Sequence, residues 1–245
     1  MPWLVQAVRL SLFVTPEAQA FEAPAWQTLT DAAPAHQATT RGVITVEEGP
    51  FGPGRLQLQA QRAPPPRIDL VLGPAPPPET SAVTLPVFGS FADAVAAVRL
   101  PAERLLQSGI ATARIAFGVM HVQSARDWAD AARIIQGTLG PTRLDIVNAQ
   151  DFLYRVNRRR TSNVVPGLPM NRLASWSCVV WQEMLINVAS GQSGGGSPAR
   201  FSATLETDFS TDEGRREPIG TQHLLALLAE LQRLTLEVAN QGDIP

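Results

Sequence analysis

The sequence predicts an α+β protein in which antiparallel sheets are each packed on a long C-terminal helix. Three features of the 245-residue chain carry this prediction. Several segments alternate apolar and polar residues with the period of a strand. Other segments place apolar residues at helical spacing, and one such segment closes each half of the chain. Clusters of proline and glycine separate the strands, as turns do.

The first half of the chain opens with a predicted strand at residues 5–14, followed by a helical or loop segment at 16–33 that Pro24 interrupts. Three alternating segments then predict an antiparallel meander at residues 42–48, 55–61 and 67–72. Ser90 and Asp93 have capping-box spacing. They open a helix or helix pair that runs to about Gln107 and ends at Gly109, with Pro101 opening its second part.

The second half follows a similar order. A capping-box pattern from Ser124 to Asp127 opens a helix to about Leu139, and residues 190–198 form a predicted flexible loop. Thr221 begins a last helix with one leucine-rich stripe, which ends at Gly242. The predicted strands are residues 111–123, 143–147, 152–158, 172–186 and 199–208.

The repeated order of strand, helix, several strands and helix predicts two tandem α+β halves, residues 1–109 and 110–245. The opening strands share an arginine in an apolar setting, in AVRLSLFV from Ala7 and TARIAFGV from Thr112. Two such sheets could stay separate or merge edge to edge, which would remove an exposed edge from each. The element order resembles the TATA-binding-protein-like and helix-grip folds, and this resemblance concerns architecture alone.

Composition restricts the classes of partner and the compartment. The net charge of −2 and the 44% hydrophobic content indicate a folded chain without an overall attraction to nucleic acid. A single cysteine, Cys178, excludes an intramolecular disulfide and favours a reducing, cytoplasmic location. The sequence contains no run of about 18 apolar residues, so we predict no membrane-spanning helix. Residues 1–20 lack the basic start of a secretory leader, so we expect none.

The candidate site lies between Asp151 and Trp181, where arginines outnumber acids. All 20 basic residues of the chain are arginine, whose planar fork binds phosphate and carboxylate in a bidentate way. Arginines and amides here could grip an anion or a partner surface, with aromatic side chains as stacking faces. The predicted site residues are Tyr154, Arg155, Asn157, Arg158, Arg160, Asn171, Arg172 and Trp176.

The alternative interpretation is that these arginines are solvated strand ends paired with acids, and that the asparagines satisfy loop backbone groups. In an extended chain Arg158 and Arg160 share one side, and Asn157 and Arg159 share the other. The acids expected as partners are Glu206, Asp208, Asp212 and Glu213.

Catalytic constellations are missing from the sequence, so we predict no catalytic residue, no metal site and no cofactor. His36, His121 and His223 are far apart and match no ligand spacing, so each is expected to be a satisfied structural or surface histidine. Cys178 lies in an alternating strand and is expected to be buried. The carboxylate pairs Asp145 with Asp151 and Glu47 with Glu48 lack a supporting base.

Four short strings resemble a scattered family of uncharacterised bacterial proteins. They are RIDLVL from Arg67, ARIAFG from Ala113, DFLYRVNRRR from Asp151 and NRLASW from Asn171. The resemblance spans most of the chain. It implies a bacterial cytoplasmic protein and no particular chemistry.

We therefore expect a non-enzymatic binding module of a bacterial cytoplasmic assembly, which docks a protein partner or a second copy of itself. The alternative is binding of nucleic acid or a nucleotide phosphate through the arginine and asparagine cluster. A third hypothesis is a metal-dependent hydrolase or nuclease that uses Asp145 or Asp151.

Overall fold

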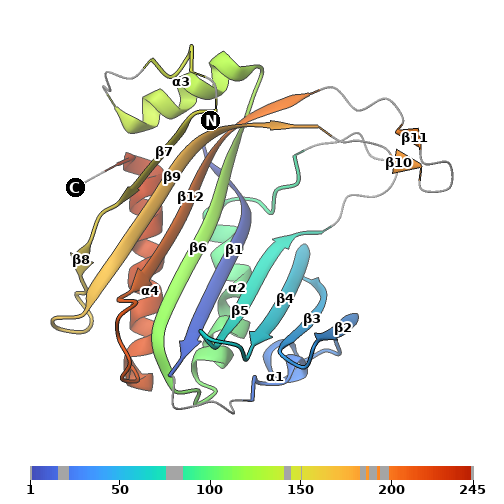
Figure 1. Ribbon diagram of the computed structural model, residues 1–245, viewed down its shortest axis with the longest axis vertical. Coiled ribbons are helices and arrows are strands. Elements are labelled where there is room, and N and C mark those ends of the chain that lie inside the picture. Colours follow the sequence, from blue (N-terminus) through green and yellow to red (C-terminus); the bar gives the residue numbers. More distant parts are fainter. Residues whose placement is uncertain are drawn as a thin grey trace.

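The computed structural model describes residues 2–15, 22–75, 85–140, 145–149, 151–182, 186–187, 192–193 and 199–243. Within these residues the protein is α+β, with one large antiparallel sheet and a C-terminal helix packed on it (Figure 1), which confirms the predicted class. The strands are β1 (Leu4–Val14), β2 (His36–Thr40), β3 (Ile44–Phe51), β4 (Gly54–Gln61), β5 (Arg67–Pro74), β6 (Thr112–Ala125), β7 (Leu153–Asn157), β8 (Arg160–Thr161), β9 (Pro169–Trp181), β10 (Ile186–Asn187), β11 (Gln192–Ser193) and β12 (Arg200–Thr211). The helices are α1 (Trp26–Thr30), α2 (Phe91–Leu106), α3 (Trp128–Leu139) and α4 (Thr221–Gln241).

Ten strands form one continuous sheet in the order β2-β3-β4-β5-β1-β6-β12-β9-β7, with β8 paired to β9 beside β7. Every neighbouring pair is antiparallel. The opening strands of the two predicted halves, β1 and β6, are direct neighbours, with Val8 opposite Val119. A short hairpin of β10 and β11 forms a second, two-stranded sheet.

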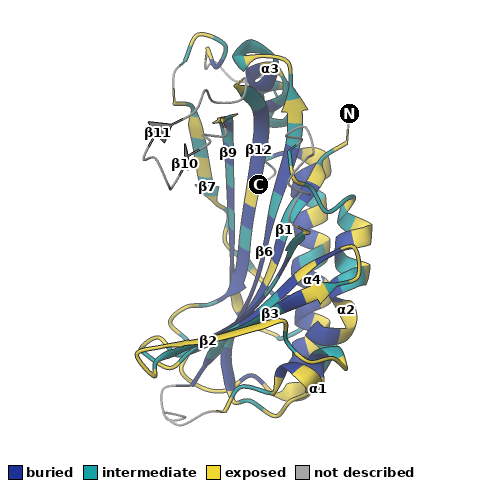
Figure 2. Cartoon of the chain, turned by 90° about the vertical axis from the view of Figure 1, so that its right-hand side faces the viewer, coloured by how far each residue is buried: buried dark blue, intermediate teal, exposed yellow. Residues whose placement is uncertain are grey.

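One face of the large sheet is covered by helices and the other carries none from the described residues. Figure 2 shows α1, α2 and α4 on the same side of the sheet. Helix α3 packs over β6, β9 and β12, and shares a hollow with α4 between Ile134 and Leu236. The uncovered side is called the open face below, and the other side the helix face.

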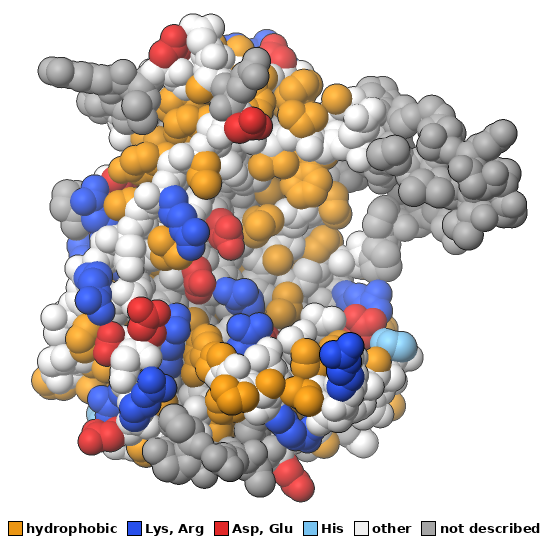
Figure 3. Space-filling view, in the orientation of Figure 1, with side chains coloured by type: hydrophobic (Ala, Val, Ile, Leu, Met, Phe, Trp, Pro, Cys, Tyr) orange, Lys and Arg blue, Asp and Glu red, His pale blue; other side chains and the backbone are white. Residues whose placement is uncertain are grey.

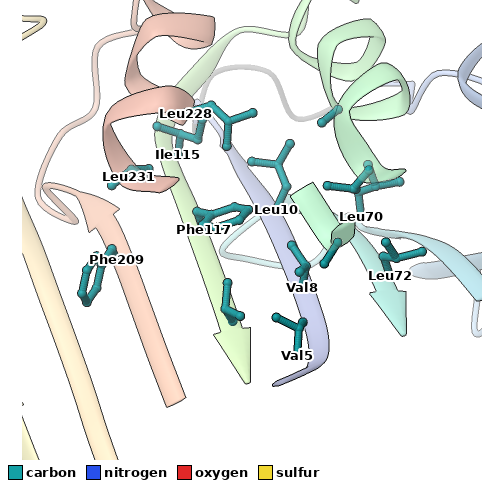
Figure 4. Packing of buried hydrophobic residues seen from close by; sticks show 14 of the residues in the cluster. Val5, Val8, Leu10, Leu70, Leu72, Ile115, Phe117, Phe209, Leu228 and Leu231 are labelled. Carbon is teal, nitrogen blue, oxygen red and sulfur yellow. The ribbon is translucent and has the colours of Figure 1, made fainter. Parts of the chain in front are cut away.

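Alternation along the strands decides which side chains reach the helices. Val8, Leu10 and Leu12 of β1 are buried, whereas Arg9 between them is exposed. Figure 4 shows residues of β1, β5, β6 and β12 packed with leucines of α4. The predicted apolar stripe of α4 supplies the buried residues Leu224, Leu228, Leu231, Leu234 and Val238.

The predicted starts of the helices agree with the structure in one case and differ in others. The capping box of Ser90 and Asp93 is confirmed at the start of α2. Pro101 lies inside α2 rather than opening a second helix. Helix α3 is capped by the side chain of Asp127, which accepts a hydrogen bond from the backbone N–H of Asp130, so it begins later than Ser124.

Three predicted elements differ in the structure. The helical segment at residues 16–33 contains only the short helix α1 among its described residues. Strand β2 was not predicted, because Ala38 is the one apolar residue in its sequence. Asp145 to Val147 form no strand, and residues 143–144 lie outside the described residues. The long strand predicted at 172–186 is β9, which ends at Trp181, followed by β10.

Cys178 is buried on β9, as predicted, and burial raises the pKa of its thiol to about 11. The thiol therefore stays protonated at neutral pH and is a poor nucleophile. Among the described residues, the helices are too short or too polar to cross a membrane.

Candidate functional site

The predicted site residues belong to β7, β8 and β9 and to the connection between β7 and β8, but they divide between the two faces of the sheet. Alternation along a strand sends neighbouring side chains to opposite faces. The helix-face group is Tyr154, Arg158, Arg160, Arg172 and Trp176. The open-face group is Arg155, Asn157 and Asn171.

On the helix face, Asp243 joins the end of α4 to strand β7. Arg158 donates two hydrogen bonds to its carboxylate, at 3.0 and 2.8 Å, and the Tyr154 hydroxyl donates a third at 2.7 Å. The Arg158 hydrogen bond contributes most to lowering the pKa of Asp243. The same carboxylate raises the pKa of Tyr154. This arrangement tethers the chain after α4 to the edge of the sheet.

Arg159 and Arg160, which directly follow Arg158, also lie next to acidic side chains. Arg159 forms an ion pair with Asp212 at 3.1 Å, and Arg160 lies 4.0 Å from Glu237 of α4. Asp212 is among the acids that the ion-pair interpretation expected, whereas Asp243 and Glu237 are not. Both lie on the last helix or directly after it, and only the tertiary structure brings them to β7 and β8.

Arg172 is 2% exposed, and no residue in the described part of the chain accepts a hydrogen bond from its guanidinium nitrogens. Its guanidinium carbon lies 5.8 Å from the centre of the Phe209 ring. Burial is the main cause that lowers the pKa of Arg172, and the neighbouring charge of Arg160 lowers it further. A buried guanidinium without acceptors is costly, because it loses hydration that nothing replaces.

We expect Arg172→Met to raise the free energy of unfolding by about 1–3 kcal/mol, because methionine fills the space without a buried charge. Urea denaturation of both proteins measures the change. Arg172→Lys is the matched control, since it keeps the charge and should bring no gain. A loss of stability in Arg172→Met would show that the guanidinium is stabilised by its surroundings.

The open face contains a groove of about 450 Å³ that runs along β9. Figure 3 shows this face, with hydrophobic side chains over its upper part and basic and acidic side chains nearer the middle. Leu153 at its rim is 62% exposed, which is unusual for a large apolar side chain in a strand. The groove is lined by Met120, Leu153, Arg155, Leu173, Ser175, Ser177, Val179, Trp181, Thr204, Glu206 and Asp208.

Strand register explains why the groove is hollow. Arg155 of β7 lies opposite Ser175 of β9, which lies opposite Glu206 of β12. The small serine leaves a gap between a cation and an anion whose strands are two sheet spacings, or about 10 Å, apart. Neither Arg155 nor Glu206 forms an ion pair with another described residue. The groove therefore offers one exposed charge of each sign that no other described residue pairs.

Next to the groove on the open face, an ion pair bridges residues that lie opposite one another on three adjacent strands. Arg9 of β1 lies opposite Gly118 of β6, which lies opposite Asp208 of β12. A Cβ at Gly118 would lie 3.5 Å from a guanidinium nitrogen of Arg9, which is an ordinary van der Waals contact, so the side chain of Arg9 crosses β6 directly over the glycine. Arg9 reaches Asp208 at 3.3 Å. Both charges of this row are thus partly neutralised.

The asparagines of the predicted site have a structural role. The side-chain amide of Asn157 donates to the side-chain oxygen of Asn171 at 3.1 Å. The Asn157 oxygen accepts a hydrogen bond from the backbone N–H of Arg172 at 3.0 Å. These bonds fix the end of β7 against β9. Asn157 satisfies a backbone N–H of a strand rather than of a loop, whereas Asn171 accepts its bond from a side chain.

The carboxylates considered for catalysis are separately engaged or exposed. Asp145 accepts a hydrogen bond from the Asn148 amide at 2.7 Å, and Glu47 accepts one from Gln37 at 3.0 Å. Glu48 pairs with Arg55. The described residues contain no group of three or more histidine, cysteine or acidic side chains that could hold a metal ion.

Sequence reasoning missed most of the groove, including Met120, Trp181 and Glu206. The polar and small residues at alternate positions of β9, Ser175 and Ser177, were a usable signal. They indicate a strand face that does not pack against a helix. Comparison with protein-family models, curated proteins and solved structures found no match to the chain.

Proposed function

We propose that the protein is a non-enzymatic docking module of a cytoplasmic bacterial assembly, and that the groove along β9 holds a segment of a protein partner. The observation that carries the proposal is the hollow over Ser175, between Arg155 and Glu206, neither of which forms an ion pair with another described residue. Large uncovered apolar surface next to polar groups is typical of interaction sites.

The chemistry of the groove defines the partner. Leu153, Leu173 and Trp181 supply apolar and aromatic surface, of the kind enriched in the centre of interfaces. Charge complementarity with Arg155 and Glu206 requires an acidic and a basic side chain on the partner, about 10 Å apart. The partner is thus expected to present a short segment with apolar side chains between two opposite charges.

Nucleic-acid binding is less favoured on the same grounds. Arg158, Arg159 and Arg160 each have an acidic neighbour, which reduces their capacity to neutralise phosphates. On the open face, Glu206 and Asp208 would repel a phosphate backbone. A hydrolytic function has no supporting cluster of ligands or bases among the described residues.

We also propose that residues 1–109 and 110–245 are two copies of one unit, joined into a saddle-like sheet similar to TATA-binding-protein-like folds. Each half starts with a central strand, β1 or β6, followed by a helix and an outward set of strands. Each half ends in a long helix, α2 or α4, on the same face. The groove along β9 belongs to the second half.

Co-purification from the native host with matched variants tests the docking proposal. Leu153→Asp and Arg155→Glu change exposed positions of the groove, so they should leave folding intact. Leu100→Asp is the control, because Leu100 is 50% exposed on α2, on the other side of the molecule. The wild type and the control should retain the same partner, and the groove variants should retain at least tenfold less.

Equal retention by all four proteins would place the partner elsewhere on the surface. A wild-type protein that sediments as a lone monomer and retains no partner at low salt would refute the docking function. If the retained partner is a second copy of the chain, sedimentation velocity of the pure protein shows it directly as a dimer that Leu153→Asp disrupts.

A further inference from the structure

A second hollow on the open face, of about 730 Å³, is lined by four arginines that are not part of the predicted cluster. It lies where β1 ends and β6 begins, between the Pro64–Pro66 turn and residues 213–216. Only one acidic side chain, Glu213, is among its lining residues. The lining residues are Phe13, Val14, Arg62, Pro64, Pro65, Pro66, Ala113, Arg114, Glu213, Arg215 and Arg216.

Arg114 contributes a positioned cation to this hollow. Its guanidinium lies 4.5 Å from the centre of the Phe13 ring, and it donates a hydrogen bond to the Ser210 hydroxyl at 3.0 Å. The nearest acid, Glu213, is 4.0 Å away and its side chain is 74% exposed. The buried Nε of Arg114 has no hydrogen-bond acceptor among the described residues. The guanidinium is thus held in place, and its ion-pair partner is a carboxylate at the limit of contact that is mostly exposed to solvent.

Arg62 and Arg216 add two exposed cations to the lining, and neither forms an ion pair with another described residue. The positive charge of Arg215 is only weakly neutralised. It donates to the backbone oxygens of Glu217 and Pro218, and it lies 3.9 Å from the Glu217 carboxylate, whose side chain is 88% exposed.

The backbone around the hollow is fixed by hydrogen bonds between segments. The N–H of Val14 donates to the oxygen of Pro66 at 2.9 Å, which holds the proline turn against β1. The N–H of Ile219 donates to the oxygen of Thr112 at 2.7 Å, which holds the segment after β12 against β6. The arginines are therefore carried by a preformed frame, which reduces the entropy lost on binding.

We infer that this hollow binds a soluble small molecule that carries two or more phosphate groups. Arginine forks match phosphate oxygens in charge and in bidentate geometry. The volume lies within the range of small-molecule sites and far exceeds what one phosphate ion would fill. Phe13, Val14 and the three prolines provide an apolar wall for an organic body, while the arginines hold the phosphates.

Isothermal titration calorimetry with inorganic pyrophosphate as the probe tests the inference, with sulfate at matched ionic strength as the reference anion. We expect saturable binding of pyrophosphate, at least tenfold tighter than sulfate. Arg62→Gln and Arg216→Gln, at exposed positions that should not affect folding, should each weaken it about tenfold. Arg133→Gln on α3, a paired surface arginine, should leave it unchanged.

Pyrophosphate binding that is no tighter than sulfate binding, or that Arg62→Gln and Arg216→Gln leave unchanged, would overturn the inference. Sedimentation with vesicles that contain phosphatidic acid separates a lipid headgroup from a free ligand. Binding to vesicles without binding to pyrophosphate would also overturn it. The Leu153→Asp variant of the docking groove should bind pyrophosphate normally, so failure of one proposal is distinguishable from failure of the other.

Discussion

Trp176→Ala should lower the free energy of unfolding by about 3–5 kcal/mol, which is the usual range for deleting a buried indole. Trp176 is fully buried on the helix face of β9, and its ring lies 5.7 Å from that of Tyr154. Tyr154 in turn holds Asp243, which tethers the end of α4. The cavity left by the missing indole would therefore lie where β7, β9 and α4 meet. Neither strand can move to fill it without breaking the backbone hydrogen bonds between β7 and β9.

Urea denaturation followed by circular dichroism measures this loss, and Trp176→Phe is the matched control. The indole Nε1 of Trp176 has no hydrogen-bond acceptor in the described part of the chain. Phenylalanine removes that unsatisfied donor while keeping most of the ring, so it should cost much less than alanine. A loss of under about 1 kcal/mol for Trp176→Ala would mean that the site collapses around the missing ring.

Acidification should destabilise the protein through His121, by about 3 kcal/mol between pH 6.5 and pH 4. The imidazole is 1% exposed on β6 and stacks on Phe91, with ring centroids 5.9 Å apart. Burial lowers its pKa to about 4, from an ordinary value near 6.5. Between these values the unfolded chain takes up a proton that the folded protein does not, so stability is complete above pH 6.5 and falls toward pH 4.

The His121→Phe variant isolates this contribution, because it keeps an aromatic ring against Phe91 and cannot be protonated. Neither nitrogen of His121 has a hydrogen-bond partner among the described residues, so the expectation of a satisfied histidine was wrong on this point. Arg133 lines the same hollow but is paired with Asp130, so burial is what opposes protonation of the imidazole. Unfolding free energies measured from pH 7 to pH 4 should fall about 3 kcal/mol less in the variant. Parallel curves would show that His121 does not control the acid response.

In the candidate site, the alternation of side chains along a strand predicts the face on which a residue lies but not the residue that it contacts. The separation of Arg158 and Arg160 from Asn157 follows from the period of an extended chain, and the structure has these residues on opposite faces. Their partners could not be predicted, because Glu237 and Asp243 are more than 75 positions away along the chain. Whether an arginine is free or paired depends on which helix packs on that face, and periodicity carries no information on this.

From the sequence alone, the α+β class, most strands, the helix start at Ser90 and the buried state of Cys178 could be predicted, because each depends on residues near one another in the chain. The tertiary structure decided that the helices of the described residues share one face and that β1 and β6 pair with each other, so that strands from both ends of the chain form one sheet. It thereby left a face that no helix of the described residues covers, with a groove between Arg155 and Glu206 and an arginine-lined hollow at Arg114. Both sites arise from strand pairings over long sequence separations, whose register is set by packing of the whole sheet rather than by local pattern.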